Sequence, residues 1–180
     1  MKVLAIQSSP NLDGLTSKTA QAVLRGARVA GAETELVHLN GLNMKPCIAC
    51  EGGWGLCRRE GTCVLEDDFQ ALRDKITEAD ALVFATPVYW HDLSESAKIF
   101  LDRLRRCEVY SDFRRFNGKR ALGIASAGGS GSGAVKALLG LEDYLRRIGF
   151  DIFDLVTVTQ RSKVHKLEML ERAGVRLVNP

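Results

Sequence analysis

The sequence alternates short apolar runs with stretches whose apolar residues recur at helical spacing, and this alternation constrains the fold most. The run ALVFATPV at residues 81–88 is almost continuously apolar, as in a strand that is buried on both faces of a parallel sheet. Because strands that alternate with helices form parallel sheets with right-handed crossovers, we predict an α/β fold with a doubly wound, five-stranded parallel sheet and helices on both faces. The other expected strands are residues 2–9, 34–39, 120–127 and 151–158.

Helical patterns follow each of these strands. Five helices are expected. The first begins near Thr16 and the second near Phe69, and the other three cover residues 97–104, 135–148 and 165–174, of which the last is short. A chain of 180 residues is the size of one domain. We therefore predict a single domain over 1–180, with a glycine- and cysteine-rich loop at about 43–65.

Composition and charge argue against several classes of function. The formal net charge is +3, which is too mild to indicate a nucleic-acid partner. No apolar run approaches the ~18 residues that a membrane-spanning helix needs, and the apolar run near residue 1 is too short for a signal peptide. We expect a cytoplasmic protein that binds neither nucleic acid nor membrane.

The first expected strand runs into a loop rich in hydrogen-bond donors, SSPNLDGLTSKT. The loop lacks both the G-x-G-x-x-G fingerprint and the G-x-x-x-x-G-K-[ST] phosphate loop. Its hydroxyl and amide groups lead straight into a helix N-terminus, where backbone N–H groups and the helix dipole favour an anion. The loop therefore suits a monophosphate. The structural alternative is a polar turn in which Thr16 or Ser17 caps the helix.

Two further loops follow the third and fourth expected strands, and in such sheets ligands bind at the carboxyl ends of the strands. Tyr89 and Trp90 stand next to each other after a buried strand, and a flat conjugated ring could cover them. The glycines of SAGGSGSGAV allow close approach of a ligand to the backbone. The alternatives are aromatic residues that pack the loop, and a flexible loop with a serine cap.

Four of the five cysteines fall within the expected loop, at positions 47, 50, 57 and 63. In a reducing compartment such clusters indicate metal binding or redox chemistry before disulfides. Thiolates hold iron–sulfur clusters and zinc, and a loop of free thiols is the third interpretation. Because the loop follows the second strand, we expect these cysteines at the ligand-binding end of the sheet. Cys107 lies in a helical pattern and is interpreted as a packed structural residue.

Together these motifs resemble the flavodoxin-like NADPH-dependent FMN reductases. SSPNLDGLTSKT is similar to their G-S-P-x-x-x-G-x-T-S phosphate loop, with Ser8 where glycine is usual. ATPVYWHDLSESAKIFLDR is similar to their T-P-V-Y-x-x-x-x-S-x-x-x-K-x-x-x-D-R segment, with His91 where glycine is common. The cysteine loop, ending in GTCVLEDDF, resembles the iron–sulfur flavoprotein branch. The match runs from residue 1 to about 150, and implies a flavodoxin-like sheet of order 2-1-3-4-5 that binds FMN.

The resemblance also implies site residues. The FMN phosphate would be held by Ser9, Asn11, Thr16 and Ser17. The isoalloxazine would lie along Pro87, Val88, Tyr89 and Trp90, and its other border would be lined by Ala127, Gly128 and Gly129. A [4Fe–4S] cluster would use Cys47, Cys50, Cys57 and Cys63. The observed spacing, C-x2-C-x6-C-x5-C, is four residues too long between the second and third cysteines for that branch.

We expect an FMN-dependent oxidoreductase that takes electrons from NAD(P)H or a reduced carrier and passes them to a small acceptor such as a quinone or free flavin. No side chain has an evident acid, base or nucleophile role, so the catalytic residues are unknown. The alternatives are a non-catalytic iron–sulfur flavoprotein electron carrier and a redox sensor that responds through the cysteine loop. The resemblance also suggests a homodimer or tetramer, with a small molecule or a redox protein as partner.

Overall fold

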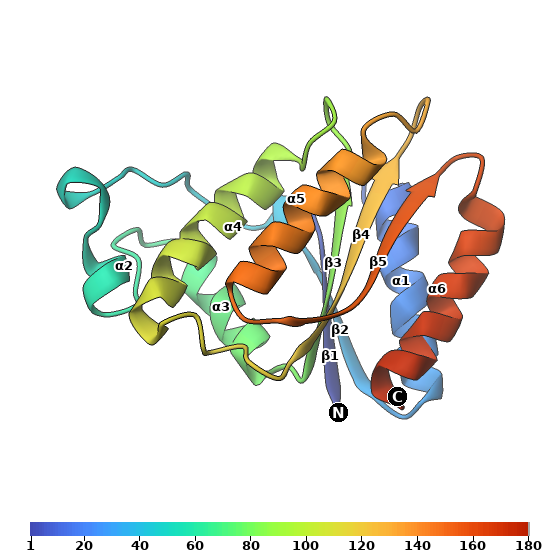
Figure 1. Ribbon diagram of the computed structural model, residues 1–180, viewed down its shortest axis with the longest axis horizontal. Coiled ribbons are helices and arrows are strands. Elements are labelled where there is room, and N and C mark those ends of the chain that lie inside the picture. The colour runs from blue at the N-terminus through green and yellow to red at the C-terminus, as the bar shows by residue number, and fades with distance from the viewer. Residues whose placement is uncertain (180) are drawn as a thin grey trace.

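The computed structural model describes residues 1–179 and contains one five-stranded parallel sheet. Its strand order, β2-β1-β3-β4-β5, confirms the predicted order (Figure 1). Every pair of neighbouring strands is parallel, with one irregularity of register between Ala121 and Leu122. The strands are β1 (Lys2–Gln7), β2 (Glu33–His38), β3 (Ala81–Pro87), β4 (Arg120–Ala127) and β5 (Asp151–Thr159).

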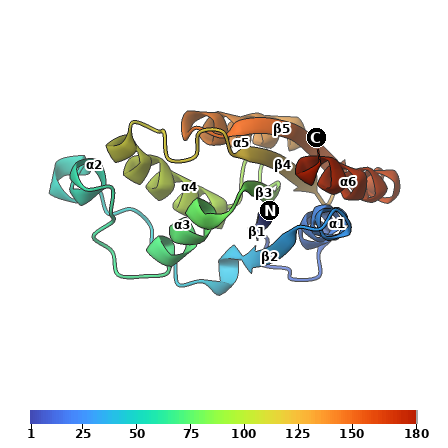
Figure 2. The same cartoon turned by 90° about the horizontal axis from the view of Figure 1, so that it is seen from below.

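Helices cover both faces of the sheet. Figure 2 shows α1 and α6 on one face and α3, α4 and α5 on the other, with α2 at the margin. The helices are α1 (Leu15–Val29), α2 (Leu56–Arg59), α3 (Phe69–Glu78), α4 (Glu95–Glu108), α5 (Ala134–Arg147) and α6 (Lys163–Val178). Three short 3-10 turns are η1 (Leu39–Gly41), η2 (Glu51–Gly53) and η3 (Val109–Ser111).

The central strand β3 explains why its sequence is almost continuously apolar. All of its residues are buried, and successive side chains of a strand point to opposite faces. Leu82 and Phe84 belong to the core under α3, α4 and α5. Val83 and Ala85 belong to the second core, under α1 and α6. A strand that supplies both cores has no solvent face on which polar residues could stand.

Helix α6 is longer than the predicted segment at 165–174, and it packs closely on α1. A Cβ atom on Gly26 would lie 1.8 Å from the carbonyl oxygen of Glu171, and one on Gly174 would lie 2.0 Å from that of Val23. The two glycines therefore let the helix backbones meet. This contact ties the C-terminal helix to the first one.

The cysteine-rich loop forms a lobe at the edge of the molecule (Figure 1). Among the described residues, the lobe contains one α-helix, the single turn α2. The sequence patterns did not predict this helix. The lobe contacts the C-terminal half of α4. Across residues 1–179, none of the helices has the length and apolar character required to traverse a bilayer.

Candidate functional site

The loops that follow β1 and β3 are joined at the carboxyl edge of the sheet. The Ser94 hydroxyl lies 2.9 Å from the Ser8 hydroxyl, and the Ser94 N–H donates to Thr86 Oγ1 at 3.2 Å. Ser94 also caps α4 by accepting a hydrogen bond from the N–H of Ala97. Ser8, which replaces the usual glycine of the motif, thus ties the first loop to the start of α4.

The first loop is ordered by its own side chains. Gln7 accepts from the N–H of Ser9 at 2.8 Å. Ser9 Oγ accepts from the N–H of Asn11 at 3.2 Å, and Asn11 Oδ1 accepts from the N–H of Asp13 at 3.1 Å. Such side-chain turns fix the loop before any ligand arrives. Two predicted phosphate ligands, Ser9 and Asn11, lie in this ordered stretch.

Helix α1 begins without a side-chain cap. Its N-cap is Gly14, so the alternative that Thr16 or Ser17 caps the helix is wrong. Ser17 Oγ accepts from Gln21 Nε2 at 3.0 Å, which leaves its own proton free to donate. Thr16 Oγ1 takes part in none of the hydrogen bonds found among residues 1–179. The start of α1 therefore brings two buried hydroxyl groups and uncapped backbone N–H groups to one point.

The second loop is a narrow hairpin. The N–H groups of Tyr89 and Asp92 each donate to the other residue's carbonyl at 3.0 Å. Trp90 and His91 occupy the turn between them with positive φ angles of 47° and 66°. Trp90 is 97% exposed, whereas Tyr89 is 42% exposed and Val88 is half-buried against the core. Pro87 ends β3 and is buried.

The third loop follows Ala127, which is buried at the end of β4. A Cβ atom on Gly128 or Gly129 would have no neighbour within 4 Å, so open space lies over this backbone. Gly133 adopts a φ of 79°, and a Cβ there would lie 2.5 Å from the Cα of His91. His91 Nε2 lies 3.1 Å from the Ser132 hydroxyl. The second and third loops are therefore in direct contact.

The three loops fit a phosphorylated planar ligand. Hydroxyl and backbone donors at the uncapped start of α1 suit a phosphate. The open backbone at Gly128 and Gly129 would admit a flat ring beside β4. Nothing in the structure tests the individual ligand assignments, which stay predictions.

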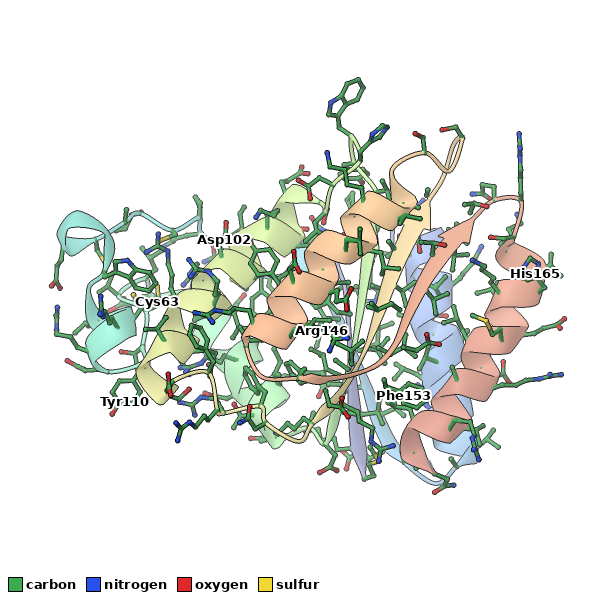
Figure 3. All side chains as sticks on the ribbon, in the orientation of Figure 1. Cys63, Asp102, Tyr110, Arg146, Phe153 and His165 are labelled. Atoms are coloured by element: carbon green, nitrogen blue, oxygen red, sulfur yellow. The ribbon has the colours of Figure 1, made fainter. Side chains whose placement is uncertain are left out.

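The cysteines meet away from this edge. All five of them line one cavity together with Arg103 and Arg106. Ser94 marks the end of α4 at the carboxyl edge of the sheet, and Cys107 lies about 20 Å further along the helix at 1.5 Å per residue. Because the other four cysteines share the cavity with Cys107, the expectation that they lie at the ligand-binding end is wrong. In Figure 3, Cys63 is seen beside the C-terminal part of α4. The lobe follows β2 in sequence, but it packs against the C-terminal half of α4.

The cysteines differ in exposure. Every cysteine is a free thiol; Cys47 is exposed, Cys50 and Cys63 are half-buried, and Cys57 and Cys107 are buried. Burial, with the nearby Cys50, raises the pKa of Cys57. Burial raises the pKa of Cys107 to about 12, and Cys63 and Cys57 contribute to the rise against the opposing charge of Arg73. Both buried thiols are therefore neutral and unreactive when no metal is bound.

Arginines of α4 hold the lobe. Arg103 is 1% exposed and pairs with Asp67 through two hydrogen bonds of 2.6 and 2.9 Å. Burial alone would raise the pKa of Asp67, but hydrogen bonds from Arg103 and from backbone N–H groups lower it overall. Arg106 donates to the carbonyl of Gly53, and its guanidinium lies 4.7 Å from the ring centre of Trp54.

The cavity is lined by cysteines, whose thiolates hold iron–sulfur clusters and zinc. Among residues 1–179, no three Cys, His, Asp or Glu side chains stand close enough to hold one metal ion. One zinc ion would require thiolates roughly 4 Å apart, whereas a cluster with one thiolate on each iron separates them further. The cavity has a volume of about 20 Å³, room for about one water molecule. The cavity would have to widen to hold a cluster, and Gly52 and Gly53 in the same lobe have open space around them.

The sequence reasoning missed a polar network on α4. Lys98 Nζ lies 2.5 Å from the Tyr144 hydroxyl, which donates to Asp102. These contacts join α4 to α5. The i,i+4 spacing of Lys98 and Asp102 is a signal that could have revealed part of the network.

Comparison with known proteins places the chain in a family. A sequence profile of the NADPH-dependent FMN reductases matches residues 1–160. The chain belongs to this family. An iron-sulfur flavoprotein from Methanocaldococcus jannaschii is 32% identical over 130 residues, which are 72% of this chain and 65% of that protein. The chain therefore spans slightly less than two thirds of that relative's length.

Solved structures share the fold of this FMN reductase family member. An NAD(P)H:quinone oxidoreductase from Methanothermobacter marburgensis superposes with a TM-score of 0.79 at 22% identity, covering 98% of this chain and 96% of that one. An archaeal flavodoxin superposes with a TM-score of 0.66 at 15% identity, covering 99% and 97%. The predicted flavodoxin-like fold is confirmed.

Proposed function

We propose that this protein is an FMN-dependent oxidoreductase that moves electrons from NAD(P)H or a reduced carrier to a small acceptor such as a quinone or free flavin. The observation that carries the proposal is the uncapped start of α1, where Thr16 and Ser17 lie at the carboxyl edge of the sheet in a member of the FMN reductase family. That combination of donors and family favours FMN over other phosphorylated ligands.

In this proposal the role of the chain's residues is to bind and orient FMN. The hydroxyls of Thr16 and Ser17 and the first N–H groups of α1 would hold the phosphate, with Ser9 and Asn11 shaping the loop. Pro87, Val88, Tyr89 and Trp90 would lie along one side of the ring, and Ala127, Gly128 and Gly129 along its other border. When bound, FMN supplies the electron-transfer chemistry. The hydrogen bond between Ser132 and His91 would keep the second and third loops together.

A second part of the proposal concerns the cysteine cavity, which we propose holds an iron–sulfur cluster. Five thiols line one cavity, and such a cluster needs four thiolates. Several relatives, including those from Methanocaldococcus jannaschii and Methanosarcina thermophila, are named iron-sulfur flavoproteins. The sequence-based ligand set was Cys47, Cys50, Cys57 and Cys63, all of which line the cavity.

Steady-state oxidation of NADPH or NADH tests the activity. Protein loaded with FMN should oxidise the nicotinamide when a quinone is added, and protein without FMN should not. The Thr16→Ala/Ser17→Ala double variant at limiting FMN serves as the control. Absence of turnover with both nicotinamides, for protein that holds FMN, would contradict a reductase.

The cysteine cavity also favours a second candidate, a non-catalytic carrier that passes single electrons between proteins. Rapid reduction of the bound flavin by a reduced ferredoxin, with no reduction by NADPH or NADH, would support the carrier. A redox sensor would instead change its structure or binding on oxidation of the thiols while showing no turnover.

We also propose a cytoplasmic homodimer or tetramer. Trp90 is 97% exposed at the tip of its loop, and a neighbouring subunit that covered it would remove a large apolar ring from water. Five free thiols are consistent with a reducing compartment. Light scattering coupled to size-exclusion chromatography gives the mass directly, and a monomer at all concentrations would contradict the assembly.

A further inference from the structure

The sequence-based ligand set for a cluster ignores one of the five thiols in the cavity. Cys107 comes from α4 and not from the cysteine loop, yet it lines the same cavity as Cys57 and Cys63. It is 1% exposed and stands on a regular helix, so its position is fixed by the fold.

Cys47 is the outermost of the five. It is exposed, and its Sγ accepts only a long hydrogen bond of 3.5 Å from the N–H of Ala49. Cys50 lies further in: a Cβ atom on Gly55, the residue before α2, would lie 2.8 Å from Cys50 Sγ. Cys50 therefore packs against the start of the helix that carries Cys57.

Arg103 supplies an independent sign that the cavity receives a hydrogen-bond acceptor. Its Nε atom is buried and has no hydrogen-bond partner in the described structure. Arg103 and Cys63 line the same cavity. A buried N–H without a partner costs free energy, and a thiolate of a bound cluster would provide the missing acceptor. Arg106, also on the cavity wall, adds a second cation.

Building on the proposed cluster, we propose that its ligands are Cys50, Cys57, Cys63 and Cys107, with Cys47 outside the set. Helix α4 then contributes the fourth thiolate in place of the first cysteine of the loop. This arrangement accounts for the long gap between Cys50 and Cys57. The gap contains the turn η2 and the start of α2, which bring Cys57 inward toward α4 instead of placing it in a compact run.

Matched variants test the ligand set: Cys47→Ser, Cys107→Ser and Cys107→Ala, purified without oxygen and reconstituted with iron and sulfide. Iron, sulfide and FMN are measured per chain, together with the paramagnetic resonance spectrum after reduction with dithionite. The alanine variant guards against misfolding, because a serine hydroxyl would be buried without a partner. A thermal melt of each variant reports the fold.

We expect Cys47→Ser to keep the iron, sulfide and spectrum of the wild type. Cys107→Ala should fall to about three iron atoms or fewer, because each iron of a four-iron cluster takes one cysteine, and should still bind FMN. A full complement in folded Cys107→Ala, or loss of the cluster in Cys47→Ser, would overturn the ligand set. A wild type that binds FMN but no iron would overturn it too and leave the flavin proposal intact. Iron without FMN would leave the ligand set standing and refute the proposed function.

Discussion

Removal of the two hydroxyls at the start of α1 should weaken FMN binding through the phosphate alone. Thr16 is 3% exposed and Ser17 is fully buried, and the described structure leaves a donor free on each. In the double variant Thr16→Ala/Ser17→Ala the phosphate would lose two hydrogen bonds, while the backbone N–H groups of the first turn would remain. We therefore expect weaker binding and not its abolition.

The expected size follows from the chemistry of these contacts. A hydrogen bond to a charged group contributes about 1.5–3 kcal/mol. Two such bonds correspond to roughly a 100- to 10,000-fold increase in Kd, at about 1.4 kcal/mol per factor of ten. Because neighbouring contacts are seldom additive, the lower end of this range is the firmer expectation.

Isothermal titration with FMN and with riboflavin separates a phosphate effect from a general one. The double variant should lose affinity for FMN and keep that of the wild type for riboflavin, which has no phosphate. Thr77→Ala, a hydroxyl deletion in α3 where the side chain bonds to the carbonyl of Arg73, is the matched control and should change neither. Unchanged FMN affinity in the double variant, or equal losses for both ligands, would refute the phosphate site.

Three further predictions concern stability and thiol reactivity. Gly26→Ala should destabilise the fold by about 1–3 kcal/mol, because its Cβ would clash with the backbone of α6; denaturant unfolding measures this, with Gly41→Ala, which has open space, as the neutral control. Asp67→Asn should cost about 3–5 kcal/mol, since it leaves a buried arginine unpaired. Folding lowers the pKa of Asp67, so the ionised carboxylate stabilises the fold above its unfolded pKa of about 3.9, and this stabilisation is lost as the pH falls through the lower folded pKa. The free energy of unfolding of Asp67→Asn, measured against pH, should therefore lack this loss on the acid side. In metal-free protein at mild alkaline pH, iodoacetamide should modify exposed Cys47 first and Cys107 last, because the pKa of Cys107 is about 12; mass spectrometry of peptides reads the order, and rapid labelling of Cys107 would contradict it.

The sheet could be predicted from the sequence because each strand carries its own signal. The apolar run at 81–88 reports burial on both faces, and the structure ends that strand at Pro87, one residue earlier. The positions of the three loops could be predicted from the strands, because parallel strands have their carboxyl ends at one edge of the sheet. The contact between His91 and Ser132 could not be predicted from the strands, because it depends on how two loops pack against each other.

The position of the cysteine lobe could not be predicted, because long-range contacts determine it. Arg106 reaches the carbonyl of Gly53 across 53 positions of sequence, and no local pattern encodes that bond. Cys107 was correctly interpreted as buried, but helical periodicity reports burial and not the neighbours of a side chain. For the same reason the pairing of Arg103 with Asp67 became visible only in the structure.

The central claim is that this chain binds FMN and uses it to accept electrons from a nicotinamide. The most direct measurement is an anaerobic titration of FMN-loaded protein with NADPH, followed by the absorbance of the oxidised flavin. We predict that this absorbance is lost in proportion to the NADPH added and returns when a quinone is supplied. Protein that binds FMN but keeps it oxidised with excess NADPH and NADH would contradict the reductase, and protein that binds no FMN would contradict the whole account.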